Sequence, residues 1–273
     1  MEMVVARHGG EFRLQRVPAE LVPAVGRAGF GARDGYWCKR FPDDTPHLDR
    51  AWANFQRLIL PMLRQVAGLD PVPWAEALEE VCRRLEPAGV DWWLTGSAAL
   101  AVRGIAVSPG DLDLVVADGD AVRVGELLLD GLMEPVAPAD WFCSWWGRAM
   151  LPPGGAGPAA AVPLGALGPA GSSVLVGAPE PGPGSASGRE SGPAGGGAGA
   201  RVEWVGGVGP AADEPLPTDF GPAAAARLET VRWRDWSVRV PPLDLQRAVS
   251  LRRGLHDRVA LIDGSGASCV VDG

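Results

Sequence analysis

The sequence predicts an α/β fold (α+β class) in which a short mixed sheet and its helices carry a small β-rich N-terminal extension. Apolar residues recur at helical spacing in several segments, and short apolar runs between these segments have the length of strands. Glycines and prolines mark the ends of both kinds of segment. The chain has 273 residues, enough for one large domain or two small ones with a full hydrophobic core.

The elements of the first half follow from local pattern. Residues 1–45 are expected to form the β-rich extension, because "MVVARHGGEFRLQRV" contains two short strands joined at Gly9-Gly10. Residues 46–150 are expected to form the first part of the core. Within it we expect strands at 90–96 and 111–116, and helices at 47–68 with a kink at Pro61, 73–87, 97–104 and 120–131.

Residues 151–200 interrupt this pattern and are expected to form a disordered Gly/Ala/Pro-rich insertion. They hold 15 of the 38 glycines and 9 of the 26 prolines. A segment of this composition buries too little apolar surface to offset the conformational entropy lost on ordering. Order is expected to resume in 201–263, the second part of the core. There we expect a strand around Glu203, a hairpin that turns near Arg234-Asp235 and two C-terminal helices, followed by a flexible tail, 264–273.

Composition narrows the class of protein. The net charge of −8 and the pI near 5.0 argue against nucleic acid or an anionic membrane surface as partners. The four cysteines lie far apart without a CxxC motif, which argues against a zinc site or a disulfide framework and fits a reducing cytosol. We see no signal peptide and no apolar run of the roughly 18 residues that a membrane span needs. A cytoplasmic protein is therefore expected.

The segment "TGSAALAVRGIAVSPGDLDLVV", residues 95–116, contains the candidate site. Strand alternation places Asp111 and Asp113 on one face, where two carboxylates repel each other and raise each other's pKa. A divalent cation removes this conflict, and Mg²⁺ favours a few carboxylates together with phosphate oxygens. Gly96 lets the backbone approach a ligand closely, and Ser97 adds a hydroxyl at the start of the following helix. Together these residues suggest a phosphate cradle facing a metal site.

This arrangement resembles the signature of the DNA polymerase β-like nucleotidyltransferase superfamily. The resemblance is carried by Gly96-Ser97, thirteen intervening residues and Asp111-Leu112-Asp113-Leu114, and it spans roughly residues 75–133 and 201–208. It is nearest to the small bacterial branch that includes antibiotic adenylyltransferases and toxin–antitoxin nucleotidyltransferases. The superfamily usually has aspartate as its third acid, whereas this sequence offers Glu203.

The resemblance implies a nucleotidyltransferase core and a Mg²⁺-dependent enzyme. Such an enzyme transfers a nucleoside monophosphate from an NTP, most simply ATP, to an acceptor hydroxyl. Asp111, Asp113 and Glu203 would then be catalytic and would bind the metal, two Mg²⁺ ions in the family pattern. Gly96 and Ser97 would bind the nucleotide. Arg103 would contact phosphate or remain an ordinary surface arginine. The alternative is a catalytically inactive nucleotide-binding or antitoxin-like interaction module.

Two further groups of residues leave alternatives open. In "RVEWV" the alternation places Arg201 and Glu203 on one face, so Arg201 would lie beside the aspartates if this strand neighbours 111–116. Near the C-terminus, arginines could reach a triphosphate or form a solvated or salt-bridged face; these are Arg252, Arg253 and Arg258.

Overall fold

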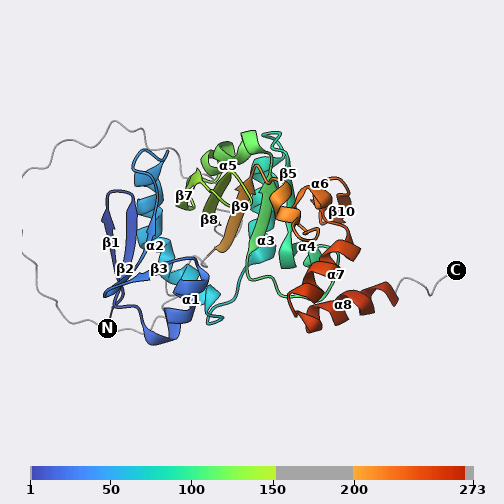
Figure 1. The fold of residues 1–273 in the computed structure, drawn as a ribbon, viewed down its shortest axis with the longest axis horizontal. Coiled ribbons are helices and arrows are strands. Elements are labelled where there is room, and N and C mark those ends of the chain that lie inside the picture. The colour runs from blue at the N-terminus through green and yellow to red at the C-terminus, as the bar shows by residue number, and fades with distance from the viewer. Residues whose placement is uncertain (1, 152–198, 268–273) are drawn as a thin grey trace, which may run out of the picture.

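The computed structural model describes residues 2–151 and 199–267. The N-terminal strands and α1 and α2 lie at one end, a central sheet in the middle, and α7 and α8 at the other end (Figure 1). The predicted disordered insertion, 151–200, lies outside the described residues apart from its ends.

The N-terminal extension forms its own sheet, as the prediction for residues 1–45 anticipated. In the described residues it has four strands in the order β1-β2-β4-β3, all neighbours antiparallel. The strands are β1 (Val4–His8), β2 (Glu11–Gln15), β3 (Gly31–Arg33) and β4 (Tyr36–Arg40), and α1 (Val22–Arg27) lies between β2 and β3. Gly9 has a φ of +56°, which suits the tight β1–β2 turn.

Helix α2 (Leu48–Val66) joins this extension to the central sheet. The ring of Phe12 on β2 is fully buried, and its centroid lies 5.1 Å from that of Trp52 and 5.0 Å from that of Phe55. The same helix contacts β7 (Leu132–Pro138) of the central sheet, where Asn54 donates hydrogen bonds to the carbonyls of Leu129 and Leu132. The extension and the sheet therefore share one hydrophobic core.

The central sheet is mixed, as the sequence predicted. Its strands in the described residues follow the order β5-β6-β9-β8-β7. Beside β7 they are β5 (Trp92–Thr95), β6 (Leu112–Val116), β8 (Trp145–Leu151) and β9 (Ala200–Gly206). Strands β6 and β9 pair in parallel, and the other neighbours are antiparallel. Strands β7 and β8 were not predicted, because β7 contains two prolines and a glutamate and β8 leads into the insertion.

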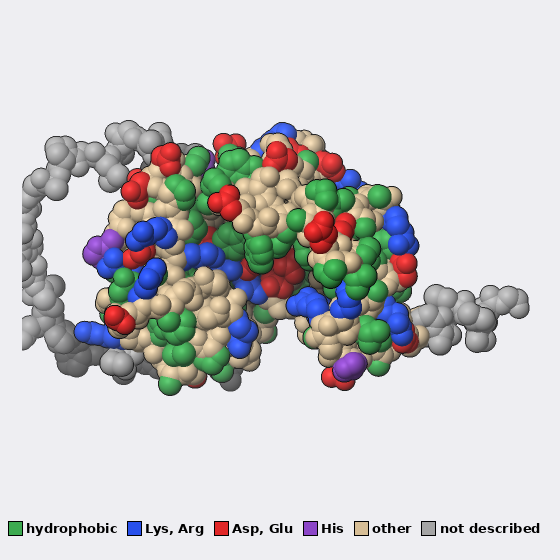
Figure 2. All heavy atoms as spheres, viewed as in Figure 1, with side chains coloured by type: hydrophobic (Ala, Val, Ile, Leu, Met, Phe, Trp, Pro, Cys, Tyr) green, Lys and Arg blue, Asp and Glu red, His purple; other side chains and the backbone are tan. Residues whose placement is uncertain are grey.

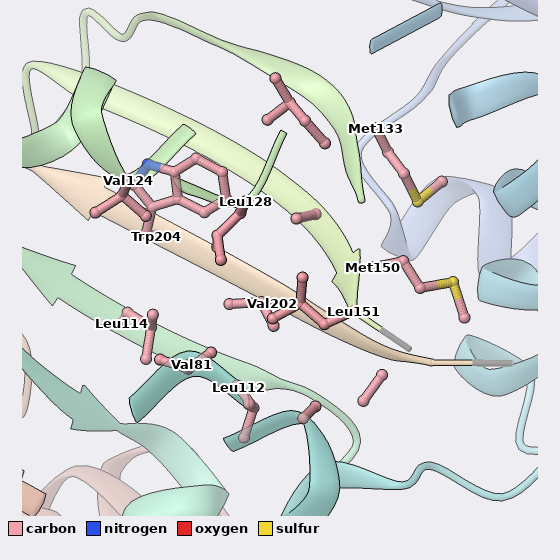
Figure 3. Close-up of a cluster of buried hydrophobic side chains, with 14 of the residues drawn as sticks. Val81, Leu112, Leu114, Val124, Leu128, Met133, Met150, Leu151, Val202 and Trp204 are labelled. Carbon is pink, nitrogen blue, oxygen red and sulfur yellow. The ribbon is translucent and has the colours of Figure 1, made fainter. Parts of the chain in front are cut away.

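One face of this sheet packs on α3 (Trp74–Leu85) and α5 (Ala121–Leu127). Leu112 and Leu114 of β6 and Val202 and Trp204 of β9 point into this core together with residues of both helices (Figure 3). The indole of Trp204 is fully buried and donates a hydrogen bond to the carbonyl of Ala121. The apolar residues of each strand thus alternate with polar residues that face the opposite side.

The C-terminal region flanks the β5 edge. It comprises α6 (Pro222–Ala225), the predicted hairpin β10 (Glu229–Trp233) and β11 (Trp236–Val240), and helices α7 (Leu243–Arg252) and α8 (His256–Ala267). Helix α4 (Gly96–Ala101) directly follows β5 and contacts both β5 and β6. The described residues contain no helix that is long and apolar enough to cross a membrane.

Two predicted boundaries need correction. The tail was expected to begin at Gly264, but α8 continues to Ala267, and the hydroxyl of Ser265 donates a hydrogen bond to the carbonyl of Ile262 one turn earlier. The helix predicted at 120–131 is shorter, because α5 ends at Leu127 and the chain turns into β7. Residues 268–273 of the predicted tail lie outside the described residues.

Candidate functional site

The molecule is hollowed between its N-terminal elements and helices α7 and α8. Acidic side chains gather on the floor of this hollow, and basic side chains stand on both sides of it (Figure 2). A cavity of about 470 Å³ opens over β6 and β9. Its polar lining includes Asp113, Glu203, Asp219 and Arg253, and its wall beside them includes Thr95 and Gly96. Three carboxylates and one guanidinium thus face the same cavity, so it can accept a ligand that carries both a cation and an anion.

A row of polar side chains crosses the face of the sheet that is turned away from α3 and α5. Cross-strand pairing aligns Thr95 with Asp113, Asp113 with Glu203, Glu203 with Arg148, and Arg148 with Glu134. Neighbouring strands of a sheet lie about 4.7–4.9 Å apart, so directly opposed residues are adjacent. The register therefore makes Asp113 and Glu203 immediate neighbours, as expected from the alternation in "DLDLVV" and "RVEWV".

Asp113 lies in this row without a partner of opposite charge. Within 2–151 and 199–267, no hydrogen bond or ion pair engages its carboxylate. Burial raises the pKa of Asp113 well above its usual range, and the negative charges of Asp111 and Glu203 raise it further. The carboxylate packs against Gly96, whose φ is +66°, and a Cβ at that position would lie 2.5 Å from Oδ2 of Asp113. Glycine at 96 is thus required by both the turn and the carboxylate.

Arg201 links the other two predicted ligands. Its guanidinium donates a hydrogen bond to Oδ2 of Asp111, which directly precedes β6, and lies 3.3 Å from Oε1 of Glu203. All three side chains are largely buried, with 13% of Arg201, 20% of Asp111 and 21% of Glu203 exposed. Burial nevertheless raises the pKa of Asp111, because the charge of Arg201 offsets it only in part. A single guanidinium therefore holds Asp111 and Glu203 together.

A second arginine continues the network toward the N-terminal sheet. The buried Arg148 donates to Oε1 of Glu203 at 2.9 Å, to Glu134, and to the carbonyl of Ala28 at 3.0 Å. Lys39 of β4, the only lysine of the sequence, lies 2.5 Å from Oε2 of Glu134. The pKa of Glu203 is lowered, since the charges of these cations outweigh the upward effect of burial. Glu203 is thus held in its charged form.

Lys39 and Arg148 also contact an aromatic ring at the edge of the cavity. The Lys39 ammonium lies 3.9 Å from the ring centroid of Trp146, and the Arg148 guanidinium lies 4.8 Å from it. Burial lowers the pKa of Lys39, although the nearby Glu134 opposes this shift. Trp146 lines the cavity, so the network forms its wall on the side of the N-terminal sheet.

Asp219 is a site residue that the sequence analysis missed. It is buried in the loop that precedes α6, and burial raises the pKa of its carboxyl. Its backbone carbonyl accepts a hydrogen bond from the hydroxyl of Thr95, which fixes this loop beside Asp113. Neither periodicity nor motif spacing distinguishes an aspartate in such a loop, so the sequence carried no signal for it.

Aromatic side chains form the outer rim of the cavity. Trp141 and Phe142 lie between β7 and β8, and Phe220 follows Asp219. The ring centroids of Trp141 and Phe142 are 4.5 Å apart, and those of Phe142 and Phe220 are 4.8 Å apart. With 76% of its surface exposed, Trp141 is available to a ligand that enters the cavity.

The remaining predicted residues occupy different positions. Gly96 lines the cavity, and the half-buried Ser97 follows it in α4. Arg103, the predicted phosphate contact, donates instead to Glu229 and to the carbonyl of Pro241, both of which lie at the β10–β11 hairpin. This arrangement corrects the expectation for Arg103: its guanidinium fastens the segment after α4 to the hairpin and does not line the cavity.

The donor chemistry of the site fits a divalent cation, whereas the present side-chain arrangement is not a closed metal cage. No group of three acidic, histidine or cysteine side chains converges on one point in the part of the chain that the structure describes. Asp113 nevertheless is a buried carboxylate that forms no ion pair with any described residue, next to two further carboxylates. Hard oxygen ligands of this kind suit Mg²⁺. Asp111 and Glu203 could join Asp113 as ligands once Arg201 turns aside.

Comparisons with known proteins give little support beyond this geometry. No protein-family model matches the chain, and no curated protein matches it. Among solved structures, the chain is similar to a crystal structure described as a "putative nucleotidyltransferase" from Thermotoga maritima. The sequence identity is 14%, the match covers 71% of this chain and 92% of that chain, and the TM-score is 0.41. A likeness at this TM-score carries no argument, so the interpretation depends on the residues of the site.

Proposed function

We propose that this protein is a Mg²⁺-dependent nucleotidyltransferase that transfers a nucleoside monophosphate from an NTP to an acceptor hydroxyl. The proposal depends chiefly on one observation, the parallel pairing of β6 and β9 that sets Asp113 directly beside Glu203 on the floor of the cavity. Asp111 directly precedes the same strand, and the Asp113 carboxylate packs against Gly96, which lines the same cavity.

The residues of the cavity would have distinct roles in this reaction. The acceptor oxygen attacks the α-phosphorus, the new O–P bond forms as the bond to the bridging oxygen breaks, and pyrophosphate leaves with that electron pair. Bound Mg²⁺ would neutralise the triphosphate and lower the pKa of the acceptor hydroxyl. Asp111 and Asp113 would hold the cation, and Glu203, kept charged by Arg148, would orient the acceptor hydroxyl and receive its proton directly or through water.

The shape of the cavity also suggests where the other parts of the substrates lie. The aromatic rim of Trp141, Phe142 and Phe220 offers exposed ring faces to a planar base. ATP is the first nucleotide to test, because the sequence resemblance is nearest to an adenylyltransferase branch. The acceptor is a hydroxyl compound that fits beside Glu203.

A nucleotide-binding module without catalysis is the second candidate, and one observation favours it. Arg148 and Arg201 together engage Oε1 of Glu203, and Arg201 also engages Asp111. If these ion pairs persist when nucleotide is bound, Glu203 cannot serve the acceptor. Both candidate functions therefore predict nucleotide binding, and only the nucleotidyltransferase predicts turnover of the NTP.

Labelled nucleotides test the proposal. The protein is incubated with each NTP carrying ³²P at the α position, with Mg²⁺ and a lysate fraction as the source of acceptor, and label is followed into acceptor while pyrophosphate release is measured. We expect α-label to enter the acceptor, and a parallel incubation with γ-labelled NTP to give no transfer. Asp113→Asn should abolish the transfer of α-label. If the protein binds NTP but neither transfers α-label nor releases pyrophosphate, it is a nucleotide-binding module and not a nucleotidyltransferase.

A further inference from the structure

Asp219 is a buried carboxylate of the cavity that the proposed reaction leaves without a role. The reaction uses Asp113 and Glu203, and Asp219 lines the same cavity. Only 8% of its surface is exposed, and no ion pair with another described residue engages its carboxylate. A carboxylate that is buried in this way is costly unless hydrogen-bond donors approach it. Asp219 therefore requires donors that a ligand in the cavity can supply.

The protein itself satisfies only part of the hydrogen-bonding capacity of this carboxylate. An ionised carboxylate has about four acceptor positions on its two oxygens. Burial raises the pKa of Asp219, and its own backbone amide and the nearby hydroxyl of Thr95 offset this shift only in part. The Thr95 hydroxyl has one proton, which it donates to the backbone carbonyl of Asp219. Acceptor positions on the carboxylate thus remain open to a ligand.

The order of the strands places Asp219 on one particular side of the cavity floor. Thr95 of β5 pairs with Asp113 of β6, and Asp113 pairs with Glu203 of β9. Because Thr95 holds the backbone of Asp219, this residue lies on the β5 side of Asp113, and Glu203 lies on the β9 side. The negative charge of Asp219 is near enough to contribute to the raised pKa of Asp113. In the proposed function Glu203 serves the acceptor, so Asp219 lies on the side of the nucleotide.

The neighbour of Asp219 along the chain belongs to the aromatic rim. Phe220 lines the cavity, and its ring centroid lies 4.8 Å from that of Phe142. In the proposed function the rim receives the base, and the cation at Asp113 receives the α-phosphate. Ribose joins these two parts of a nucleotide, so it lies in the interval between Asp113 and Phe220. Asp219 occupies this interval.

The chemistry of a carboxylate selects among the groups that a nucleotide presents there. A phosphate oxygen carries the same charge and is repelled, whereas the ribose hydroxyls are hydrogen-bond donors. Carboxylates accept hydrogen bonds from ribose hydroxyls in dinucleotide-binding folds as well. A buried carboxylate that loses such donors is left unsatisfied, so a nucleotide without the hydroxyls binds more weakly.

We propose that Asp219 accepts hydrogen bonds from the ribose hydroxyls of the nucleotide and makes the cavity selective for ribonucleoside triphosphates. This inference rests on the proposed function, because that function places the base at the rim and the α-phosphate over Asp113. It makes Asp219 a residue that determines specificity and gives it no part in the transfer of the nucleotide.

Calorimetric titration of the full chain tests this contact. ATP and dideoxy-ATP, which lacks both ribose hydroxyls, are titrated in Mg²⁺ buffer without acceptor into wild type, Asp219→Ala, Asp219→Asn and Asp235→Ala. The last variant is the control, since Asp235 is an exposed residue in the β10–β11 turn and does not line the cavity. We expect wild type to bind ATP about tenfold or more tighter than dideoxy-ATP, as the loss of a hydrogen bond to a charged group predicts. Asp219→Ala should bind both nucleotides equally, and Asp235→Ala should keep the wild-type preference.

Two comparisons separate this contact from a folding defect. Dideoxy-ATP cannot make the contact, so Asp219→Ala should bind it at least as tightly as wild type does, and a disrupted cavity would not. Asp219→Asn keeps an acceptor oxygen and loses the charge, so it should retain an intermediate preference for ATP. The hydrogen bond from Thr95 uses the backbone carbonyl of residue 219, which both variants preserve.

Equal binding of ATP and dideoxy-ATP by wild type, or no binding of either, would overturn the proposal. A preference for ATP that persists at full strength in both Asp219 variants would also overturn it, and if Asp219→Ala loses both nucleotides, Asp219→Asn decides by the same criterion. The contact and the proposed function can fail separately. Transfer of α-label together with equal affinities would reject the contact alone. A preference for ATP that disappears in Asp219→Ala, without transfer of α-label, would reject the nucleotidyltransferase and leave the contact standing.

Discussion

Replacing Arg201 by glutamine tests whether this arginine is the counter-charge of the carboxylate cluster. The substitution keeps a hydrogen-bond donor and removes the positive charge that Asp111 and Glu203 share. Removing one partner of a fully buried ion pair costs about 3–5 kcal/mol. These side chains remain 13–21% exposed, and Arg148 still engages Glu203. We therefore expect the free energy of unfolding to fall by about 2 kcal/mol in the absence of divalent cations.

The assay is thermal and urea unfolding of wild type and Arg201→Gln, with EDTA and with Mg²⁺. A loss of about 2 kcal/mol corresponds to a melting temperature lower by about 4–8 °C for a chain of this size. Because Mg²⁺ replaces the missing charge, it should stabilise the variant more than wild type. At a concentration 100 times its Kd for the variant, Mg²⁺ would raise the variant's free energy of unfolding by about 2.7 kcal/mol. Arg247→Gln, which breaks only the exposed pair with Asp263, is the control.

Two results would contradict this role of Arg201. If Arg201→Gln melts with wild type in EDTA, the guanidinium contributes nothing to the charge balance of the site. If Mg²⁺ raises the melting temperature of both proteins equally, Arg201 does not compete with the cation, and the cation binds elsewhere.

Three further substitutions give independent checks. Asp113→Asn should stabilise the metal-free protein and flatten the pH dependence of its stability. Burial raises the pKa of Asp113, so wild type loses stability as pH rises from the usual aspartate range through the raised pKa. Urea unfolding between pH 4 and pH 9 measures this dependence, and an equal slope for both proteins would contradict the prediction. Glu203→Gln should nearly eliminate α-label transfer while NTP binding, followed by calorimetry, persists; full transfer by this variant would remove Glu203 from the mechanism. Arg103→Gln should leave nucleotide affinity unchanged and cost at most about 1 kcal/mol of stability, because its partner Glu229 is 49% exposed; a large loss of affinity would restore the original assignment.

Local pattern was sufficient to predict the parts of the site that lie in regular elements. Asp113 and Glu203 follow strand alternation, and each lies opposite a row of apolar residues that fixes which face it occupies. The neighbourhood of Arg201 and Asp111 also follows from alternation once β6 and β9 pair. Strand alternation predicts these positions because a shift of the strand register by one residue would bury the charged side chains and expose the apolar ones.

Other parts of the site depend on contacts between distant segments, which local pattern does not encode. Arg148 reaches Glu203 through β8, a strand whose sequence begins with two tryptophans and a glycine and ends at the insertion. Asp219 is positioned by the Thr95 hydroxyl across more than a hundred residues. Local pattern indicated no partner for Arg103, because its partner Glu229 lies in the β10–β11 hairpin far along the chain.

A crystal structure with a bound cation and nucleotide would show whether Asp111 and Asp113 hold the metal. Crystals grown with Mn²⁺ and an NTP whose α–β bridging oxygen is replaced by a methylene group would reveal the cation by anomalous scattering. We expect Mn²⁺ bound by Asp111 and Asp113, with oxygen distances of about 2.1–2.2 Å, typical of hard divalent cations, and with Arg201 released from Asp111. Mn²⁺ bound away from Asp113, or nucleotide bound while Arg201 still pairs with Asp111 and Glu203, would contradict it.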